Sequence, residues 1–130
     1  MENAPSTTVL LVEDNEVFRE ALELMLGVVE DVRVVGAVGD GRAAVDACAL
    51  LRPDVVLMDY RLPGLDGVEA TAAIRACSAS AVVALTATAD DAELDALYDA
   101  GAVACLTKDS SLDEIVGAIR SASSRGASLV

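Results

Sequence analysis

The sequence lacks histidine and tryptophan altogether and has few aromatic residues and few positive charges. Of its 130 residues, 9 are Lys or Arg and 22 are Asp or Glu, which gives a formal net charge of −13. Binding to duplex nucleic acid rests on basic residues that displace counterions, so this balance argues against a nucleic-acid-binding chain. The three cysteines form no CxxC pair and have no histidine beside them, which favours neither a zinc site nor a disulfide framework. A reducing cytosol fits this cysteine usage, and we expect a cytoplasmic protein.

Long hydrophobic runs are also absent. No apolar stretch approaches the roughly 20 residues that a membrane-spanning helix needs. The first eight residues have no basic start and no apolar core, so they do not resemble a signal peptide. The chain instead carries 54% hydrophobic residues, and with so few aromatics its core must be built from Val, Leu, Ile and Ala. A chain of this length is expected to bury one core and to form one domain.

Short, continuously apolar stretches rich in β-branched residues alternate with helical patterns. Continuous hydrophobicity is typical of strands in a parallel sheet, because helices cover both of its faces. The alternation predicts an α/β fold of the (βα)5, flavodoxin-like type, with a doubly wound parallel five-stranded sheet in a three-layer α/β/α arrangement. The predicted strands are Val9–Glu13, Val32–Val38, Val55–Asp59, Val82–Thr86 and Val103–Leu106.

Helix start signals lie between the predicted strands. Asn15 stands just before an amphipathic stripe and is a candidate N-cap. Asp90 and Ser111 are each followed three residues later by a glutamate, which is the spacing of a capping box. Residues 121–128 are small and polar and predict a frayed end or the start of a linker. We therefore expect a disordered N-terminus over residues 1–7, a folded domain over 8–122 and a tail or linker over 123–130.

Acids, a hydroxyl and an amine follow the predicted strands at one edge of the sheet. In an open parallel sheet, ligands bind beyond the carboxyl ends of the strands. Three acids there would repel one another unless a hard cation lay between them, and carboxylate oxygens suit Mg²⁺. A hydroxyl and an ammonium at the same edge would suit a phosphoryl group on an aspartate. The residues are Glu13 and Asp14 after the first strand, Asp59 at the end of the third, Thr86 at the end of the fourth and Lys108 after the fifth.

Taken singly, several of these residues have an ordinary structural interpretation. Thr86 alone would be a strand-end threonine, and Lys108 alone would be a surface lysine. Asp14 alone would be a cap of the helix that follows it. Their joint placement at strand ends is what favours a functional site.

Four motifs in this order resemble the receiver domain of two-component response regulators, and together they span nearly the whole chain. The motifs are Leu10–Asn15, Leu57–Gly67, Ala84–Ala87 and Gly101–Lys108. The segment from Met58 to Ala70, with Asp109 after the lysine, is most similar to NarL/FixJ-type regulators. In those proteins a LuxR-like helix-turn-helix domain follows the receiver. This chain resembles a receiver without its output domain, and both a truncated chain and a natural stand-alone protein fit.

The resemblance implies a phosphorylation site with a magnesium ion. Asp59 would accept the phosphoryl group from a phosphohistidine or a small phosphodonor. Asp14 would be the main Mg²⁺ ligand, and Glu13 would bind the ion directly or through water. Asp59 and the backbone carbonyl of Arg61 would complete the ligands that the protein supplies.

The resemblance also assigns the phosphoryl contacts and the partners. Thr86 and the backbone of Ala87 would bind phosphoryl oxygens, and Lys108 would pair first with Asp59 and later with the phosphate. A sensor histidine kinase would be the phosphodonor, and phosphorylation would favour a homodimer or a rearranged partner surface. With its acidic charge the chain itself is expected not to bind DNA, so contact with DNA would come from an output domain. Without a long apolar run, it is also expected to have no membrane partner.

Two positions depart from the family pattern. Cys105 stands where most receivers have Tyr, Phe or His, the aromatic side chain that changes rotamer on activation. Because a thiol is far smaller, we expect weaker, but not absent, coupling between phosphorylation and the surface. Asp109 follows Lys108 where many receivers have proline, a change that we expect to alter only a loop.

Three other functions fit parts of the sequence. Haloacid-dehalogenase-type phosphatases also use a strand-end aspartate with Mg²⁺, but they need a second acid two residues later, where this chain has Arg61. A phosphorylation-independent interaction domain would usually lack the acceptor, the acids or the lysine, and only Cys105 favours it. A dinucleotide-binding domain would need a G-x-G-x-x-G loop after the first strand, which the sequence lacks.

Overall fold

The computed structural model describes residues 6–87 and 90–128. In this part of the chain, five strands alternate with five helices, and the strands form one parallel sheet in the order β2-β1-β3-β4-β5. The predicted α/β fold class is confirmed. The strands are β1 (Thr7–Val12), β2 (Val32–Val38), β3 (Val55–Asp59), β4 (Ala81–Thr86) and β5 (Ala104–Thr107), and the helices are α1 (Glu16–Gly27), α2 (Gly41–Leu51), α3 (Gly67–Cys77), α4 (Asp91–Ala100) and α5 (Leu112–Ser128).

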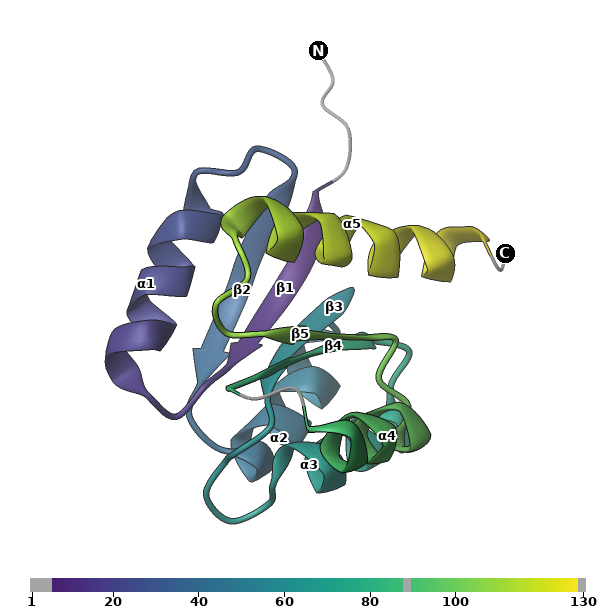
Figure 1. Ribbon diagram of the computed structural model, residues 1–130. Coiled ribbons are helices and arrows are strands. Elements are labelled where there is room, and N and C mark those ends of the chain that lie inside the picture. Colours follow the sequence, from purple (N-terminus) through teal and green to yellow (C-terminus); the bar gives the residue numbers. More distant parts are fainter. Residues whose placement is uncertain (1–5, 88–89, 129–130) are drawn as a thin grey trace.

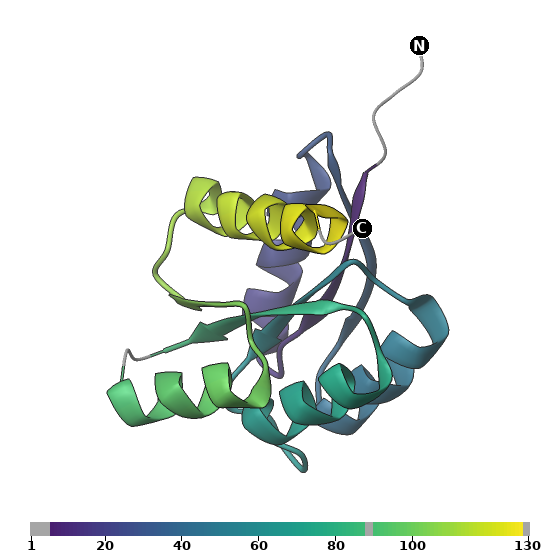
Figure 2. The ribbon, with the colours of Figure 1, turned by 90° about the vertical axis from the view of Figure 1, so that its right-hand side faces the viewer.

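Helices cover both faces of the sheet, α1 and α5 on one face and α2, α3 and α4 on the other (Figures 1 and 2). Strand residues alternate between the two layers. Val9 and Leu11 of β1 pack in the core beneath α1 and α5, whereas Leu10 and Val12 pack in the core of the opposite layer. Because both layers are apolar, these strands show no polar alternation in the sequence.

The β1–β2 pair contains one irregularity. Val9 pairs with Val34, but the next β1 residue pairs with Gly36, so Val35 is an extra residue in β2. Val34 packs against the core beneath α1 and α5, and beyond the extra residue Ala37 packs there as well. The bulge therefore shifts the two-residue alternation of β2 by one position.

Polar caps define the helix starts. The Asn15 side chain accepts a hydrogen bond from the Phe18 N–H (2.9 Å), which confirms it as the N-cap of α1. Ser111 and Glu114 form the predicted reciprocal box at the start of α5. Asp90 is confirmed as the N-cap of α4, because its side chain accepts hydrogen bonds from the backbone N–H groups of Ala92 and Glu93.

The element ends differ from the sequence predictions in a few places. β2 and β3 have the predicted bounds, and the other strands shift by one or two residues at their ends. The predicted disordered start over 1–7 lies partly outside the described residues, and Thr7 already belongs to β1. Residues 121–128, predicted as a frayed end or the start of a linker, are helical, because α5 continues to Ser128. Its apolar spacing extends to the buried Ala122, and no proline interrupts the chain.

Within the described residues, every helix is too short or too polar to cross a lipid bilayer.

Candidate functional site

The loop after β3 holds Asp59 at the carboxyl edge of the central strand. β3 lies between β1 and β4, and Asp59 is its last residue. Gly67 must lack a side chain here, since a Cβ at this position would lie 2.6 Å from the Asp59 carbonyl oxygen. The Gly67 N–H donates to the Tyr60 carbonyl (2.8 Å), and Asp66 and Glu69 form a capping box. The glycine and the capping box together start α3 directly against the backbone of Asp59.

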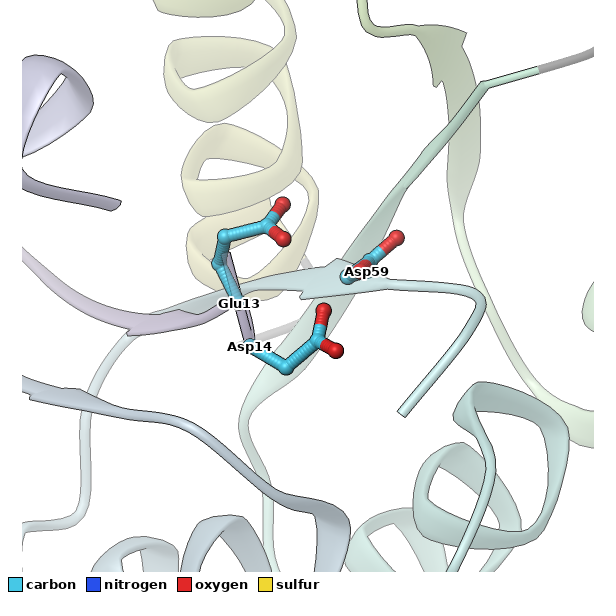
Figure 3. Close-up of side chains that lie close together, drawn as sticks. All are labelled: Glu13, Asp14 and Asp59. Carbon is cyan, nitrogen blue, oxygen red and sulfur yellow. The ribbon is translucent and has the colours of Figure 1, made fainter. Parts of the chain in front are cut away.

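Three carboxylates meet at this edge. Glu13 and Asp14 follow β1, and each of these acids places an oxygen within 4.8 Å of the others and of Asp59. Figure 3 shows the three side chains around one common space. Glu13 and Asp59 are buried, with side chains 2% and 4% exposed, whereas Asp14 is exposed to solvent. The predicted acidic cluster is therefore assembled by the fold.

Lys108 enters the cluster from the loop after β5. Its Nζ lies 2.8 Å from Glu13 Oε1 and 3.3 Å from Asp59 Oδ1. Its backbone N–H donates to the Thr86 carbonyl (2.8 Å), and its ammonium lies 5.1 Å from the centroid of the Phe18 ring. The lysine therefore pairs with both buried acids, and its contact with Glu13 is the shorter one.

The charges of the cluster do not balance. Burial, followed by the negative charge of Glu13, raises the pKa of Asp59 to about 6, although Lys108 acts in the opposite direction. Burial alone would lower the pKa of the Lys108 ammonium, but its hydrogen bond to Glu13 and the nearby negative charges outweigh burial and raise it. Three carboxylates thus face one ammonium, and the excess negative charge attracts a further cation.

This donor set fits a magnesium ion. The three closely spaced carboxylate oxygens are hard ligands of the kind that Mg²⁺ prefers, and Asp14 leaves the site open to water. The Arg61 N–H lies 3.4 Å from Asp59 Oδ1, so the backbone of Arg61 runs beside the cluster.

Thr86 and Ala87 lie at the same edge through strand pairing. Asp59 pairs with Leu85 in the β3–β4 register, and Thr86 is the next residue. Thr86 is buried and is the last residue of β4, and the exposed Ala87 follows it. The fold thus places these two predicted phosphoryl contacts beside Asp59.

Cys105 lies within β5, two residues before its end. It pairs with Ala84 of β4 and is partly buried against the layer of α2, α3 and α4. Burial raises the pKa of its thiol, and a hydrogen bond from Tyr98 of α4 lowers that pKa in part. The aromatic side chain near this position is therefore supplied by α4. Asp109 accepts a hydrogen bond from Thr107, and the described peptide bonds contain no cis form.

Several contributing residues were not predicted from the sequence. Arg19 donates from Nη1 to the Glu13 carbonyl (2.8 Å) and so fixes the backbone beside the acids. Phe18 faces the Lys108 ammonium, and the Arg61 side chain forms an ion pair with Glu93 of α4. Helical spacing was the available signal for Phe18, which follows the buried stripe of α1. No local pattern pointed to the contact between Arg61 and Glu93, because it joins distant segments.

The sequence matches the family model described as "Response regulator receiver domain" over residues 9–120. It is 40% identical over 116 residues to the transcriptional regulatory protein LiaR of Bacillus subtilis, covering 88% of this chain and 55% of LiaR. It is 38% identical over 114 residues to a probable transcriptional regulatory protein NarL of Mycobacterium tuberculosis, covering 85% of this chain and 52% of that protein. The chain thus spans about half the length of these curated relatives.

Solved structures agree in fold. The signal receiver domain of the putative response regulator NarL from Mycobacterium tuberculosis superposes with a TM-score of 0.90 at 34% identity, covering 93% of this chain and 98% of that one. The response regulator domain of Thermotoga maritima CheB superposes with a TM-score of 0.85 at 30% identity, covering 92% and 97%. With the family match spanning most of its length, the chain belongs to the response regulator receiver domains of two-component systems.

Proposed function

We propose that Asp59 is the phosphoacceptor of this receiver domain and that it takes its phosphoryl group from a sensor histidine kinase. The observation that carries the proposal is the convergence of three carboxylates and Lys108 at the end of β3, with Asp59 in contact with the lysine. Of the three acids, Asp59 alone lies on the central strand of the sheet. Glu13 and Asp14 follow β1, where they suit cation binding.

The proposed reaction is an in-line displacement at phosphorus. A carboxylate oxygen of Asp59 attacks, the bond from phosphorus to the donor atom breaks, and its electron pair leaves with the donor. Mg²⁺, when bound, supplies positive charge to the carboxylate and phosphoryl oxygens. The Lys108 ammonium, the Thr86 hydroxyl and the Ala87 N–H then donate to the oxygens that gain negative charge.

We infer that this step controls an output and is not turnover of a free substrate. Arg61 occupies the position where haloacid-dehalogenase-type phosphatases carry their second acid, which supports stoichiometric self-phosphorylation. Similarity to the transcriptional regulatory protein LiaR supports a transcriptional output. We infer that this output passes through a LuxR-type DNA-binding domain and that the protein is cytoplasmic. A homodimer on phosphorylation is part of the same proposal, as is the absence of direct DNA binding by this chain.

The test is intact-mass spectrometry after incubation with acetyl phosphate and Mg²⁺. The wild-type chain is expected to gain one phosphoryl group, and Asp59→Asn is expected to gain none. Asp54→Asn, which changes an aspartate at the opposite edge of the sheet, is the matched control and should be labelled like the wild type. Full labelling of Asp59→Asn would disprove the assignment of the acceptor.

A further inference from the structure

An ion pair connects the phosphoacceptor loop to α4. Arg61 follows Asp59 by two residues, and its Nη2 lies 3.6 Å from Glu93 Oε2 in the first turn of α4. The Arg61 side chain is 73% exposed, whereas that of Glu93 is only 18% exposed. The guanidinium therefore holds a mostly buried carboxylate while remaining able to turn through solvent.

The backbone of the same arginine borders the reacting carboxylate. The Arg61 N–H lies 3.4 Å from Asp59 Oδ1, and Arg61 and Asp14 line one shallow hollow beside the site. The Arg61 side chain is long and exposed and starts next to Asp59. Once a phosphoryl group is present, the guanidinium has two possible anionic partners, the phosphoryl group and the Glu93 carboxylate. In the unphosphorylated chain its partner is Glu93.

The start of α4 concentrates negative charge. Asp90 is the N-cap, and Asp91 and Glu93 stand in the first turn. Acids at a helix N-terminus are stabilised by the backbone N–H groups, but three of them also repel one another. The contact with Arg61 offsets part of this repulsion, so removing it destabilises the first turn.

A phosphoryl group on Asp59 competes for this guanidinium. The group carries close to two negative charges and three acceptor oxygens, and arginine binds phosphate through two parallel hydrogen bonds. A single contact between a largely exposed arginine and a carboxylate is weaker. An arginine that can reach both the phosphoryl group and Glu93 therefore binds the phosphoryl group in preference.

We propose that the Arg61 guanidinium is a further ligand of the phosphoryl group and that it leaves Glu93 to bind it, which loosens the start of α4. The inference rests on the proposed function, since it requires phosphorylation of Asp59. It supplies this chain with a route from the site to α4 that does not pass through position 105, where the switching aromatic is replaced by Cys105.

Beryllofluoride, a mimic of the phosphoryl group, provides the binding test in the presence of Mg²⁺. Arg61→Gln should weaken beryllofluoride binding by roughly two- to five-fold, the range expected for one exposed charge contact. Glu93→Gln should strengthen it by a similar factor, because the arginine then has one competitor fewer. The double variant should behave like Arg61→Gln, and Arg61→Lys should restore part of the affinity.

Amide hydrogen exchange over residues 91–100 gives a second readout. In the wild type, beryllofluoride should speed exchange in the first turn of α4, and in Arg61→Gln it should add no change. Arg120→Gln removes a different exposed ion pair, that with Asp31, and is the matched control that should respond like the wild type.

The outcomes separate the two proposals. Opposite shifts in affinity for Arg61→Gln and Glu93→Gln support the role of Arg61, because a merely structural pair would shift both in the same direction. Wild-type affinity in both variants, or equal losses in both, would overturn this role while leaving phosphorylation of Asp59 intact. If the wild type neither binds beryllofluoride nor is labelled by acetyl phosphate, the proposed function fails, and the role of Arg61 fails with it.

Discussion

The two edges of the sheet use polar groups in opposite ways. At the amino edge, Asp54 accepts hydrogen bonds from the Thr8 N–H (2.9 Å) and hydroxyl (3.1 Å), and the Asp54 N–H donates back to that hydroxyl (2.9 Å). At the carboxyl edge, three acids surround one ammonium. One edge therefore joins strands through matched donors and acceptors, while the other holds more negative than positive charges close together.

Buried polar groups at the two edges show the same difference. Ser80, buried before β4, donates from its hydroxyl to the Pro53 carbonyl (2.6 Å) and accepts from the Ser78 hydroxyl (2.9 Å). Arg75 donates to the Ser80 carbonyl (2.8 Å). The buried Asp59 instead has a pKa raised to about 6, because burial and Glu13 oppose its charge. The polar groups of the amino edge therefore stabilise the domain, whereas the buried acids of the carboxyl edge oppose one another and lower its stability.

Lys108→Met should show this difference most strongly. Methionine keeps much of the apolar stem but removes the ammonium that faces Glu13 and Asp59. Removing one partner of a buried charge pair is expected to cost roughly 3 kcal/mol of unfolding free energy in metal-free urea denaturation. Arg75→Met at the amino edge loses a bond to a carbonyl and should cost about 1 kcal/mol. Equal losses at the two edges would contradict the contrast.

Magnesium should stabilise the carboxyl edge alone. An ion that binds only the folded chain adds about 2.7 kcal/mol when its concentration is 100 times its dissociation constant. Thermal melts with and without Mg²⁺ should therefore show an upward shift in the wild type and none in Asp14→Ala. Asp54→Ala should keep the shift although it lowers the starting stability. A shift that survives in Asp14→Ala would place the ion elsewhere.

Acidification should relieve repulsion at the site. The folded pKa of Asp59, about 6, lies above the ordinary value of 3.8, so between these values the folded chain binds a proton that the unfolded chain does not. Its contribution to unfolding free energy therefore increases as the pH falls from 7 toward 5. Relative to Asp59→Asn, the metal-free wild type should gain about 1 kcal/mol in urea titrations at these two pH values. An equal gain in the Asn variant would assign the titration to another group.

Neutral substitutions should change stability with opposite signs at the two edges. Asp54→Ala leaves the Thr8 N–H and hydroxyl without their acceptor and should cost about 1 kcal/mol. Asp59→Asn removes one of two buried like charges and should stabilise the metal-free domain by a comparable or smaller amount. Denaturation at pH 7 without Mg²⁺ measures both, and two changes of the same sign would count against the division between the edges.

The smallest expected effect concerns position 105. Cys105→Tyr restores an aromatic side chain on β5 and should enlarge the change in amide exchange that beryllofluoride produces across α4 and β5, because more packing then depends on where Thr86 lies. The thermal melt of the variant reports any cost of overpacking. Equal responses in wild type and variant would show that the aromatic is dispensable here.

The sequence was most informative where strands end. Asp59 and its neighbours could be placed at one edge because hydrophobic runs mark parallel strands and parallel strands align their carboxyl ends. The closer pairing of Lys108 with Glu13 could not be predicted, since it depends on how β1 and β5 twist relative to each other across two intervening strands. The extent of α5 was missed because small polar residues are compatible with either a helix or a linker, and the buried Ala122 favours the helix.

Contacts between segments that are distant in the sequence could not be predicted from local patterns either. The hydrogen bonds between Thr8 and Asp54 join segments that are 46 residues apart, and the local sequence of neither segment indicates that it contacts the other. Arg61 could be recognised as a departure from the phosphatase pattern, but its pairing with Glu93 required the position of α4. Local sequence therefore indicated which residues reach the site, and packing decided which of them touch.

Lys108 is the only lysine in the chain, so the side chain that pairs with both buried acids is also the only ε-amine in the molecule. Reductive methylation with isotopically labelled formaldehyde would place a single side-chain NMR probe inside the site, alongside the one on the N-terminal amine. Methylation keeps the positive charge, and the signal of the labelled amine would respond to each anion that it faces. The Lys108 amine could therefore serve as a spectroscopic reporter of the candidate site without any engineered substitution.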